Sequence, residues 1–220
     1  MECEDIDSLD QEWHFTTGGS SSSSSVPVSQ PWKSWEEMPE SPPTWLEDKY
    51  VFLEVFSGLA GLSKSVHEQG VVVLPPIDIL IDGFVRSRTD ILNNEVRRKI
   101  LRWIRSGVIK LLHVGTPCTT FSSARKSDDG GPPPLRSKEF TRGLPECMDG
   151  RMGESLRSQC IEGNLFLTYT VLFCREVFKA GGNFTIENPA ESIFWYDPAV
   201  IQLGEDTKST MVEMDQCSYG

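Results

Sequence analysis

The fold follows from one stretch of sequence, Val51-Phe52-Leu53-Glu54-Val55-Phe56-Ser57-Gly58-Leu59-Ala60-Gly61. Its first half is an apolar run with the length of a buried strand, and its second half is a turn of small residues. Small side chains allow backbone N–H groups and the start of the next helix to come close to a ligand. The stretch therefore predicts a strand whose carboxyl end binds a nucleotide or an adenosyl group. A plain strand-to-helix turn is an equal alternative, since Ala60 stands where the usual pattern has its middle glycine.

Short apolar runs alternate with helical periodicity on both sides of this turn. Strands are expected at residues 51–55, 71–74, 109–114 and 183–186, and a further one at 211–214. Helices are expected at residues 62–69, 93–106 and 164–180, each ended by a glycine. Such alternation is typical of βαβ units, so the chain is predicted to form an α/β fold with a mostly parallel sheet and helices on both faces.

The charge divides the chain into an acidic tail, residues 1–48, and a domain, residues 49–220. The tail holds 11 Asp and Glu residues against one lysine, a net charge of −10, and it contains the run Ser20 to Ser25. A segment this polar buries too little surface to offset its ordering entropy, so the tail is predicted to be disordered. Its tryptophans Trp32, Trp35 and Trp45 form either a docking motif or a patch that packs transiently on the domain, and the second reading is favoured.

Within the domain, residues 86–151 are basic and residues 119–150 lack a regular pattern. The basic segment carries 14 Lys and Arg against 7 Asp and Glu, a net charge of +7, which suits either a polyanion or a solvated helix face. The second segment is rich in Gly, Pro and charged residues, and loops of this length are usually functional or disordered. It is predicted to be a mobile loop.

Several classes of protein are excluded by composition. The 220 residues contain no run of eighteen apolar residues for a membrane span, and the acidic amino terminus does not resemble a signal peptide. The six cysteines form no CxxC pair, which argues against a zinc ribbon or a disulfide scaffold, and no metal site is expected. An intracellular protein with reduced thiols is predicted.

Two acidic residues follow the turn of small residues at 56–61, which we call the glycine turn. Asp78 comes after the second expected strand, where a carboxylate accepts hydrogen bonds from ribose hydroxyls. Asp90 precedes the basic helix, where it either caps that helix or contacts the amino group of an adenine.

Two further residues fall at the carboxyl ends of expected strands, where open α/β sheets bind ligands. Cys118, in Gly115-Thr116-Pro117-Cys118-Thr119-Thr120-Phe121-Ser122, is a candidate nucleophile beside Arg125, although a lone cysteine is more often an inert apolar residue. Glu187, in Phe184-Thr185-Ile186-Glu187-Asn188-Pro189, is a carboxylate at the end of an apolar strand. A salt bridge or a helix cap is the alternative role for Glu187.

Taken together over about residues 50–220, these motifs resemble the cytosine-C5 DNA methyltransferase family, whose methyl donor is S-adenosylmethionine. The matching positions are Phe56, Ser57, Gly58, Leu59, Ala60 and Gly61 for the glycine motif, Asp78 and Asp90 for the acidic positions, Pro117-Cys118 and Phe121-Ser122 for the nucleophile motif, Glu187-Asn188 for the Glu-Asn motif, and Tyr219-Gly220 for the start of a later motif. Thr116, Ala60 and Pro189 depart from the residues common in the family.

The resemblance implies a Rossmann-like methyltransferase fold, truncated at its carboxyl-terminal end because the family's arginine motif and target-recognition region would follow Gly220. It implies that Cys118 adds to C6 of the base, that Glu187 stabilises protonated N3, and that Pro117 lies in the cofactor site. Asn188, Thr119, Ser122 and Arg125 are the expected substrate contacts. DNA is the expected partner, with RNA methylation or an inactive remnant that binds cofactor or nucleic acid as alternatives. The protein would work in the nucleus of a eukaryote or the cytoplasm of a bacterium, and its oligomeric state is left open.

Overall fold

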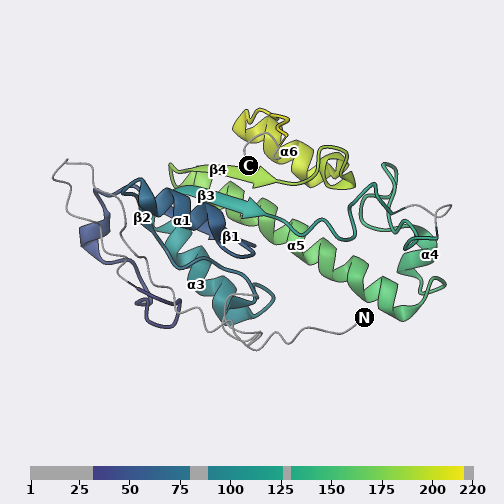
Figure 1. The fold of residues 1–220 in the computed structure, drawn as a ribbon, viewed down its shortest axis with the longest axis horizontal. Helices are drawn as coiled ribbons and strands as arrows, with labels where there is room; N and C mark the ends of the chain where they lie inside the picture. Colours follow the sequence, from purple (N-terminus) through teal and green to yellow (C-terminus); the bar gives the residue numbers. More distant parts are fainter. Residues whose placement is uncertain (1–31, 80–88, 126–129, 216–220) are drawn as a thin grey trace, which may run out of the picture.

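A four-stranded parallel sheet organises the molecule in a computed structural model, which describes residues 32–79, 89–125 and 130–215. The strand order is β2-β1-β3-β4, and every neighbouring pair is parallel (Figure 1). The strands are β1 Val51–Val55, β2 Val72–Val73, β3 Ile109–Gly115 and β4 Asn183–Glu187. The predicted parallel sheet is therefore confirmed.

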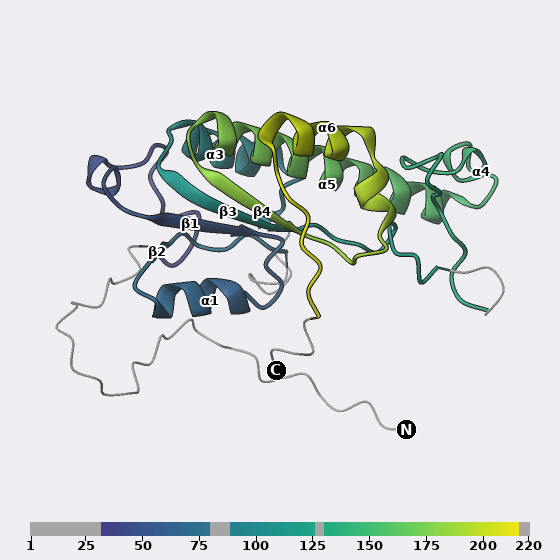
Figure 2. The same ribbon diagram turned by 90° about the horizontal axis from the view of Figure 1, so that it is seen from above.

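Helices cover both faces of this sheet (Figure 2). On one face lies α1 Gly61–Glu68, and on the other lie α3 Asn94–Arg105, α5 Glu154–Lys179 and α6 Pro198–Thr207. Every residue of β1 is buried, as expected for a strand covered on both faces. The architecture is a mixed α/β fold that is compatible with a Rossmann-like arrangement.

The helix boundaries follow local sequence signals. Asn93 caps α3 by accepting a hydrogen bond from the backbone N–H of Glu95, and Ile100, Trp103 and Ile104 form its buried face. Helix α5 begins at Glu154, well before the expected start at residue 164. Its first turns bury Cys160 and a glycine rather than large apolar side chains, which is why periodicity missed them. No described helix is both long enough and apolar enough to cross a bilayer.

Residues 32–48, which we call the N-terminal strap, pack against the domain and include the short helix η1 Thr44–Leu46. Trp35, Met38 and Leu46 are buried in the main core. The expectation that the disordered tail extends to residue 48 therefore needs correction. Residues 1–31, the rest of that tail, lie outside the described residues.

Hydrogen bonds fix the strap to the domain. The indole N–H of Trp35 donates to the carbonyl oxygen of Pro75 at 2.6 Å, and the Lys99 ammonium donates to the carbonyl oxygens of Trp35 and Met38. Trp32 packs edge-on against Trp103 at 5.4 Å between ring centroids. The tryptophans thus anchor the strap to α3 and to the segment after β2, which agrees with the favoured reading that they pack on the domain.

The expected mobile loop 119–150, which the structure describes at residues 119–125 and 130–150, is anchored at several buried residues although parts of it are exposed. It contains α4 Pro145–Met148, and Leu135 and Cys147 form a small second core with Cys160 of α5. Arg136 is also buried. These contacts supply the order that composition alone did not predict.

The expected strand at residues 211–214 is not formed. Met211, Val212 and Met214 are exposed and lie in irregular backbone. A short apolar run cannot form a strand without a neighbour that pairs with it.

Candidate functional site

The turn after β1 has an unusual backbone conformation. Phe56, Gly58 and Ala60 all have positive φ, at 58°, 55° and 56°. Left-handed conformations cost non-glycine residues roughly 1–2 kcal/mol each, and such strain gathers at functional sites. The turn is therefore a sharp strand-to-helix connection that brings Gly61, the first residue of α1, close to the end of β1. Leu59, at its tip, is 85% exposed.

Glu54, which motif reasoning did not single out, caps α1 from inside the sheet. Its carboxylate accepts hydrogen bonds from the backbone N–H of Ser63 at 2.8 Å and from the Ser63 hydroxyl at 2.5 Å. Burial raises the pKa of Glu54, and the two hydrogen bonds from Ser63 oppose that rise. The signal for this role was a charged residue inside an otherwise apolar strand.

Asp78 lies against the glycine turn, as its position in the sequence predicts. Its carboxylate accepts a hydrogen bond from the backbone N–H of Gly58 at 2.9 Å, across twenty positions of sequence. The Thr89 hydroxyl donates to the carbonyl oxygen of Asp78 at 2.7 Å, which brings the neighbour of Asp90 to the same place. The structure therefore joins the glycine turn, Asp78 and the segment of Asp90.

Asp90 itself shapes the entry to α3 without capping it. Its carboxylate accepts from the backbone N–H of Leu92 at 2.8 Å, while Asn93 provides the cap. The alternative role of Asp90 as the helix cap is therefore wrong, and its contact with an adenine remains a prediction.

Cys118 lies in a tight turn directly after β3. Its carbonyl oxygen accepts hydrogen bonds from the backbone N–H groups of Phe121 at 2.8 Å and Ser122 at 2.9 Å. The thiol is free and half-buried, Pro117 is half-buried, and Thr119 is exposed. We call residues 116–122 the cysteine turn.

Hydrogen bonds at both ends of the cysteine turn join it to the segment that follows Glu187. The side-chain amide of Asn188 donates to the carbonyl oxygen of Thr116 at 2.7 Å. At the other end of the turn, the backbone N–H of Ile193 donates to the carbonyl oxygen of Phe121 at 2.9 Å. Cys118 lies between these two tethers, so its turn and the segment after Glu187 form one unit.

Glu187 lies beside β3 at the carboxyl edge of the sheet. It pairs in register with Gly115, and its side chain is exposed. A Cβ atom added to Gly115 would lie 3.0 Å from the carbonyl oxygen of Phe56 and 3.8 Å from a Glu187 carboxylate oxygen. The ends of β1, β3 and β4, each carrying one of the sequence motifs, therefore meet around Gly115.

Two buried polar atoms at this edge have no hydrogen-bond partner within the described part of the chain. They are the hydroxyl oxygen of Ser57, in the glycine turn, and the side-chain oxygen of Asn188. Buried polar atoms are seldom left without a partner, so these two mark the places in the site where a water molecule or a small local rearrangement would be needed to satisfy them.

The polar groups expected to contact a substrate are partly engaged inside the protein. Arg125 donates to the carbonyl oxygens of Thr119 at 2.9 Å and Pro133 at 3.2 Å, and to the side chain of Gln159 at 3.3 Å. The Ser122 hydroxyl accepts from the backbone N–H of Ala124 at 3.1 Å. Arg125 therefore links Thr119 of the cysteine turn to Pro133 and Gln159, a role that sequence alone did not indicate.

The basic side chains of α3 are also paired internally. Arg102 forms an ion pair with Glu40 of the strap, Arg105 pairs with Glu176 at 2.6 Å, and Arg97 stacks over the ring of Tyr169. These contacts engage three of the 14 basic residues that suggested a polyanion-binding segment at residues 86–151.

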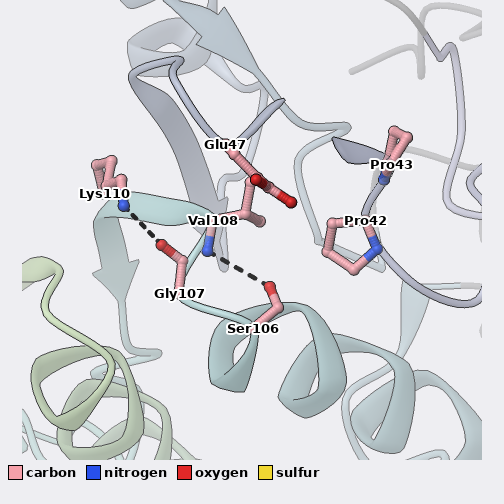
Figure 3. Close-up of a pocket in the computed structure, with 7 residues that line it drawn as sticks. All are labelled: Pro42, Pro43, Glu47, Ser106, Gly107, Val108 and Lys110. Atoms are coloured by element: carbon pink, nitrogen blue, oxygen red, sulfur yellow. Dashed lines mark hydrogen bonds between the residues drawn. The ribbon is translucent and has the colours of Figure 1, made fainter. Parts of the chain in front are cut away.

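A shallow pocket lies at the opposite edge of the sheet, where the strands begin (Figure 3). It has a volume of about 260 Å³ and is lined by Pro42, Pro43, Glu47, Ser106, Gly107, Val108 and Lys110. Lys110 turns back to the carbonyl oxygen of Gly107 at 2.8 Å. None of the motif residues lines this pocket, so it is separate from the candidate site.

The chain matches no family model, no curated protein and no solved structure.

Proposed function

We propose that the chain transfers a methyl group from S-adenosylmethionine to C5 of cytosine in DNA, through a covalent bond between Cys118 and C6 of the base. The observation that carries this proposal is the double tether of the cysteine turn to the segment after Glu187. It brings a thiol and a carboxylate that lie far apart in sequence to one edge of a parallel sheet, beside a narrow glycine turn.

The residues of the first strand end would hold the cofactor. The glycine turn and Pro117 would line its site, Asp78 would accept hydrogen bonds from its ribose and Asp90 from its adenine amino group. When bound, the cofactor supplies an electrophilic methyl group on a sulfonium.

The residues of the other two strand ends would act on the base. Cytosine C5 is a weak nucleophile, and addition of the Cys118 thiolate to C6 makes C5 electron-rich enough to accept a methyl group. Glu187 would hold N3 in its protonated form during this addition, with Asn188, Thr119 and Ser122 beside it. Loss of the C5 proton and elimination of the Cys118 sulfur then release the product. A stacked and paired cytosine cannot present C6 to Cys118 and N3 to Glu187, so the base would have to leave its stack.

Trapping with 5-fluorocytosine DNA tests this proposal directly. Fluorine at C5 leaves no proton to lose, so the Cys118 adduct would persist in denaturing electrophoresis when S-adenosylmethionine is present. We expect Cys118→Ser and Cys118→Ala to abolish the adduct and Glu187→Gln to reduce it. Cys174→Ala is the matched control, because burial raises the pKa of that thiol and keeps it protonated.

Cofactor binding and substrate choice are tested separately. Calorimetric titration with S-adenosylmethionine should give saturable binding that Asp78→Ala weakens, and no binding by the wild-type chain would refute the methyl donor. Parallel trapping with 5-fluorocytosine RNA decides the substrate, since an adduct formed only with RNA would contradict the choice of DNA. Binding of cofactor without any adduct would identify an inactive remnant.

A further inference from the structure

Arg136 lies buried between the cysteine turn and α5, and all five of its N–H groups have acceptors. Nε and Nη2 donate to the Thr120 hydroxyl at 3.2 and 3.0 Å. Nη1 donates to the Thr141 carbonyl at 2.7 Å and to the Asn164 side chain at 2.6 Å, and Nη2 also donates to the Cys160 carbonyl at 2.9 Å. A fully satisfied, buried guanidinium of this kind fixes the groups around it.

The partners of Arg136 are neutral, which is unusual for a buried cation. Each hydrogen-bonding oxygen that the described residues offer it belongs to a hydroxyl, an amide or a backbone carbonyl. Its guanidinium also stacks over the ring of Phe121, 3.9 Å from the centroid. Burial lowers the pKa of Arg136 to about 10, so it remains protonated at neutral pH.

Helix α5 is shaped to receive this cluster. A Cβ atom on Gly163 would lie 2.5 Å from the Thr120 hydroxyl oxygen and 2.8 Å from Nη2 of Arg136. Glycine inside a helix costs about 1 kcal/mol relative to alanine, so its presence needs a reason. The close approach of Thr120 and Arg136 provides that reason.

The contacts of Arg136 lead directly to the candidate nucleophile. Thr120 and Phe121 are the second and third residues after Cys118, and the backbone N–H of Phe121 donates to the Cys118 carbonyl. We propose that Arg136 is a positioning residue for Cys118, which it holds in place through Thr120 and Phe121. This inference rests on the proposed function, in which Cys118 is the nucleophile, and it makes residues 133–144 a fixed support for the site.

Three variants test the inference. Arg136→Lys keeps the charge but cannot make the five-donor pattern, and Thr120→Val removes the shared acceptor with little change of shape. Arg157→Lys is the matched control, because Arg157 donates to a backbone carbonyl, that of Met148, at 2.9 Å without touching the cysteine turn. Thermal unfolding and circular dichroism identify the variants that remain folded.

The first measurement is the rate at which iodoacetamide alkylates Cys118 in the cofactor-free protein, followed by peptide mass spectrometry over a range of pH. Release of the turn exposes the half-buried thiol, so we expect Arg136→Lys and Thr120→Val to raise the rate about threefold or more, the equivalent of one lost hydrogen bond. Arg157→Lys should leave the rate unchanged. Wild-type rates in both folded variants would overturn the inference.

The second measurement is the rate of adduct formation at saturating 5-fluorocytosine DNA. It should fall about threefold or more in the same two variants, for the same loss of about one hydrogen bond, while their dissociation constants for DNA stay within twofold of wild type. General destabilisation would raise the alkylation of the buried Cys174 as well, whereas lost positioning should raise that of Cys118 alone. A parallel fall in alkylation and trapping would overturn the inference. If the wild-type chain forms no adduct, the proposed function fails, and the alkylation rates still decide whether Arg136 positions Cys118.

The double variant Arg136→Lys with Thr120→Val completes the test. If Arg136 acts through Thr120, the double variant should alkylate no faster than the faster single variant. Multiplicative effects would show two independent supports and contradict the proposed route.

Discussion

The side-chain amide of Asn188 lies 2.7 Å from the carbonyl oxygen of Thr116 and joins two strand ends that are 72 positions apart in sequence. The second tether, from Ile193 to Phe121, closes the same connection on the far side of Cys118. The cysteine turn is thus held at both ends by the segment after Glu187. Substitutions in that segment should therefore alter the position of Cys118.

Asn188→Ala should weaken this connection. It leaves the Thr116 carbonyl without its donor, and we expect the free energy of unfolding to fall by about 1 kcal/mol. Urea denaturation measures the change. Asn183→Ala, at the exposed first residue of β4, should stay within about 0.5 kcal/mol of wild type. Equal effects of the two substitutions would show that the tether contributes nothing specific.

Gly115→Ala should disturb the junction of the three strand ends. The new methyl group would press on the carbonyl oxygen of Phe56, and overpacking of this kind typically costs about 1–3 kcal/mol. Gly204→Ala provides the opposite case, since that helical position in α6 has open space around it and alanine there should stabilise by about 1 kcal/mol. Opposite shifts of the thermal midpoint are expected, and a neutral Gly115→Ala would contradict the close approach.

Removal of the Trp35 side chain should show that the N-terminal strap belongs to the domain. Trp35 is 4% exposed, and Trp35→Ala should lower the free energy of unfolding by about 3–5 kcal/mol. Trp45, at 49% exposed, is the control, and Trp45→Ala should cost about 1 kcal/mol. Chemical denaturation compares the two. Similar small losses would mean that the strap adds little to stability.

A chain that begins at residue 49 should be much less stable than one that begins at residue 32. The shorter chain loses Trp35, Met38 and Leu46 from the core and exposes the face of α3 that they cover. Limited proteolysis of the two chains measures the difference. Equal resistance would restore the domain boundary expected from composition.

The raised pKa of Glu54 should make the free energy of unfolding depend on pH. Because burial raises its pKa above 4.5, its carboxyl binds a proton more tightly in the folded state than in the unfolded state. Its contribution therefore favours folding below the unfolded pKa, and that contribution is lost as the pH rises through the folded pKa. The difference in unfolding free energy between Glu54→Gln and wild type should shift in favour of the variant from about pH 4 to about pH 8.

Ser63→Ala is the matched variant for that measurement. The Ser63 hydroxyl donates to the carboxylate and lowers the pKa of Glu54, so its removal should move the transition to higher pH. A difference between Glu54→Gln and wild type that does not change with pH would contradict the burial effect.

The sheet and α3 could be predicted from sequence because their signals are local. Apolar runs of strand length and an apolar helix face ended by Gly107 depend on few neighbours, and β1 and β3 lie where periodicity places them. The gathering of Asp78 with the glycine turn was also predictable, since parallel strands end at one edge. The short apolar run at residues 211–214 was misleading because a strand also needs a partner.

The supports of the site were not predictable from local patterns. Arg136 lies in a segment rich in proline and glycine, and nothing in its neighbours indicates that it is buried. The strap has a polar composition, yet a few tryptophans provide enough buried surface to order it against α3. Both depend on contacts across long stretches of chain, which composition does not record.

The two tethers of the cysteine turn also bear on folding. Closing a loop of about seventy residues carries an entropic cost that is recovered only when the contacts at its ends form. A nascent chain would hold Cys118 loosely until β4 has been synthesised and has docked beside β3. The rate at which the Cys118 thiol reacts should therefore fall during refolding when β4 docks beside β3, so this rate measures that step of folding.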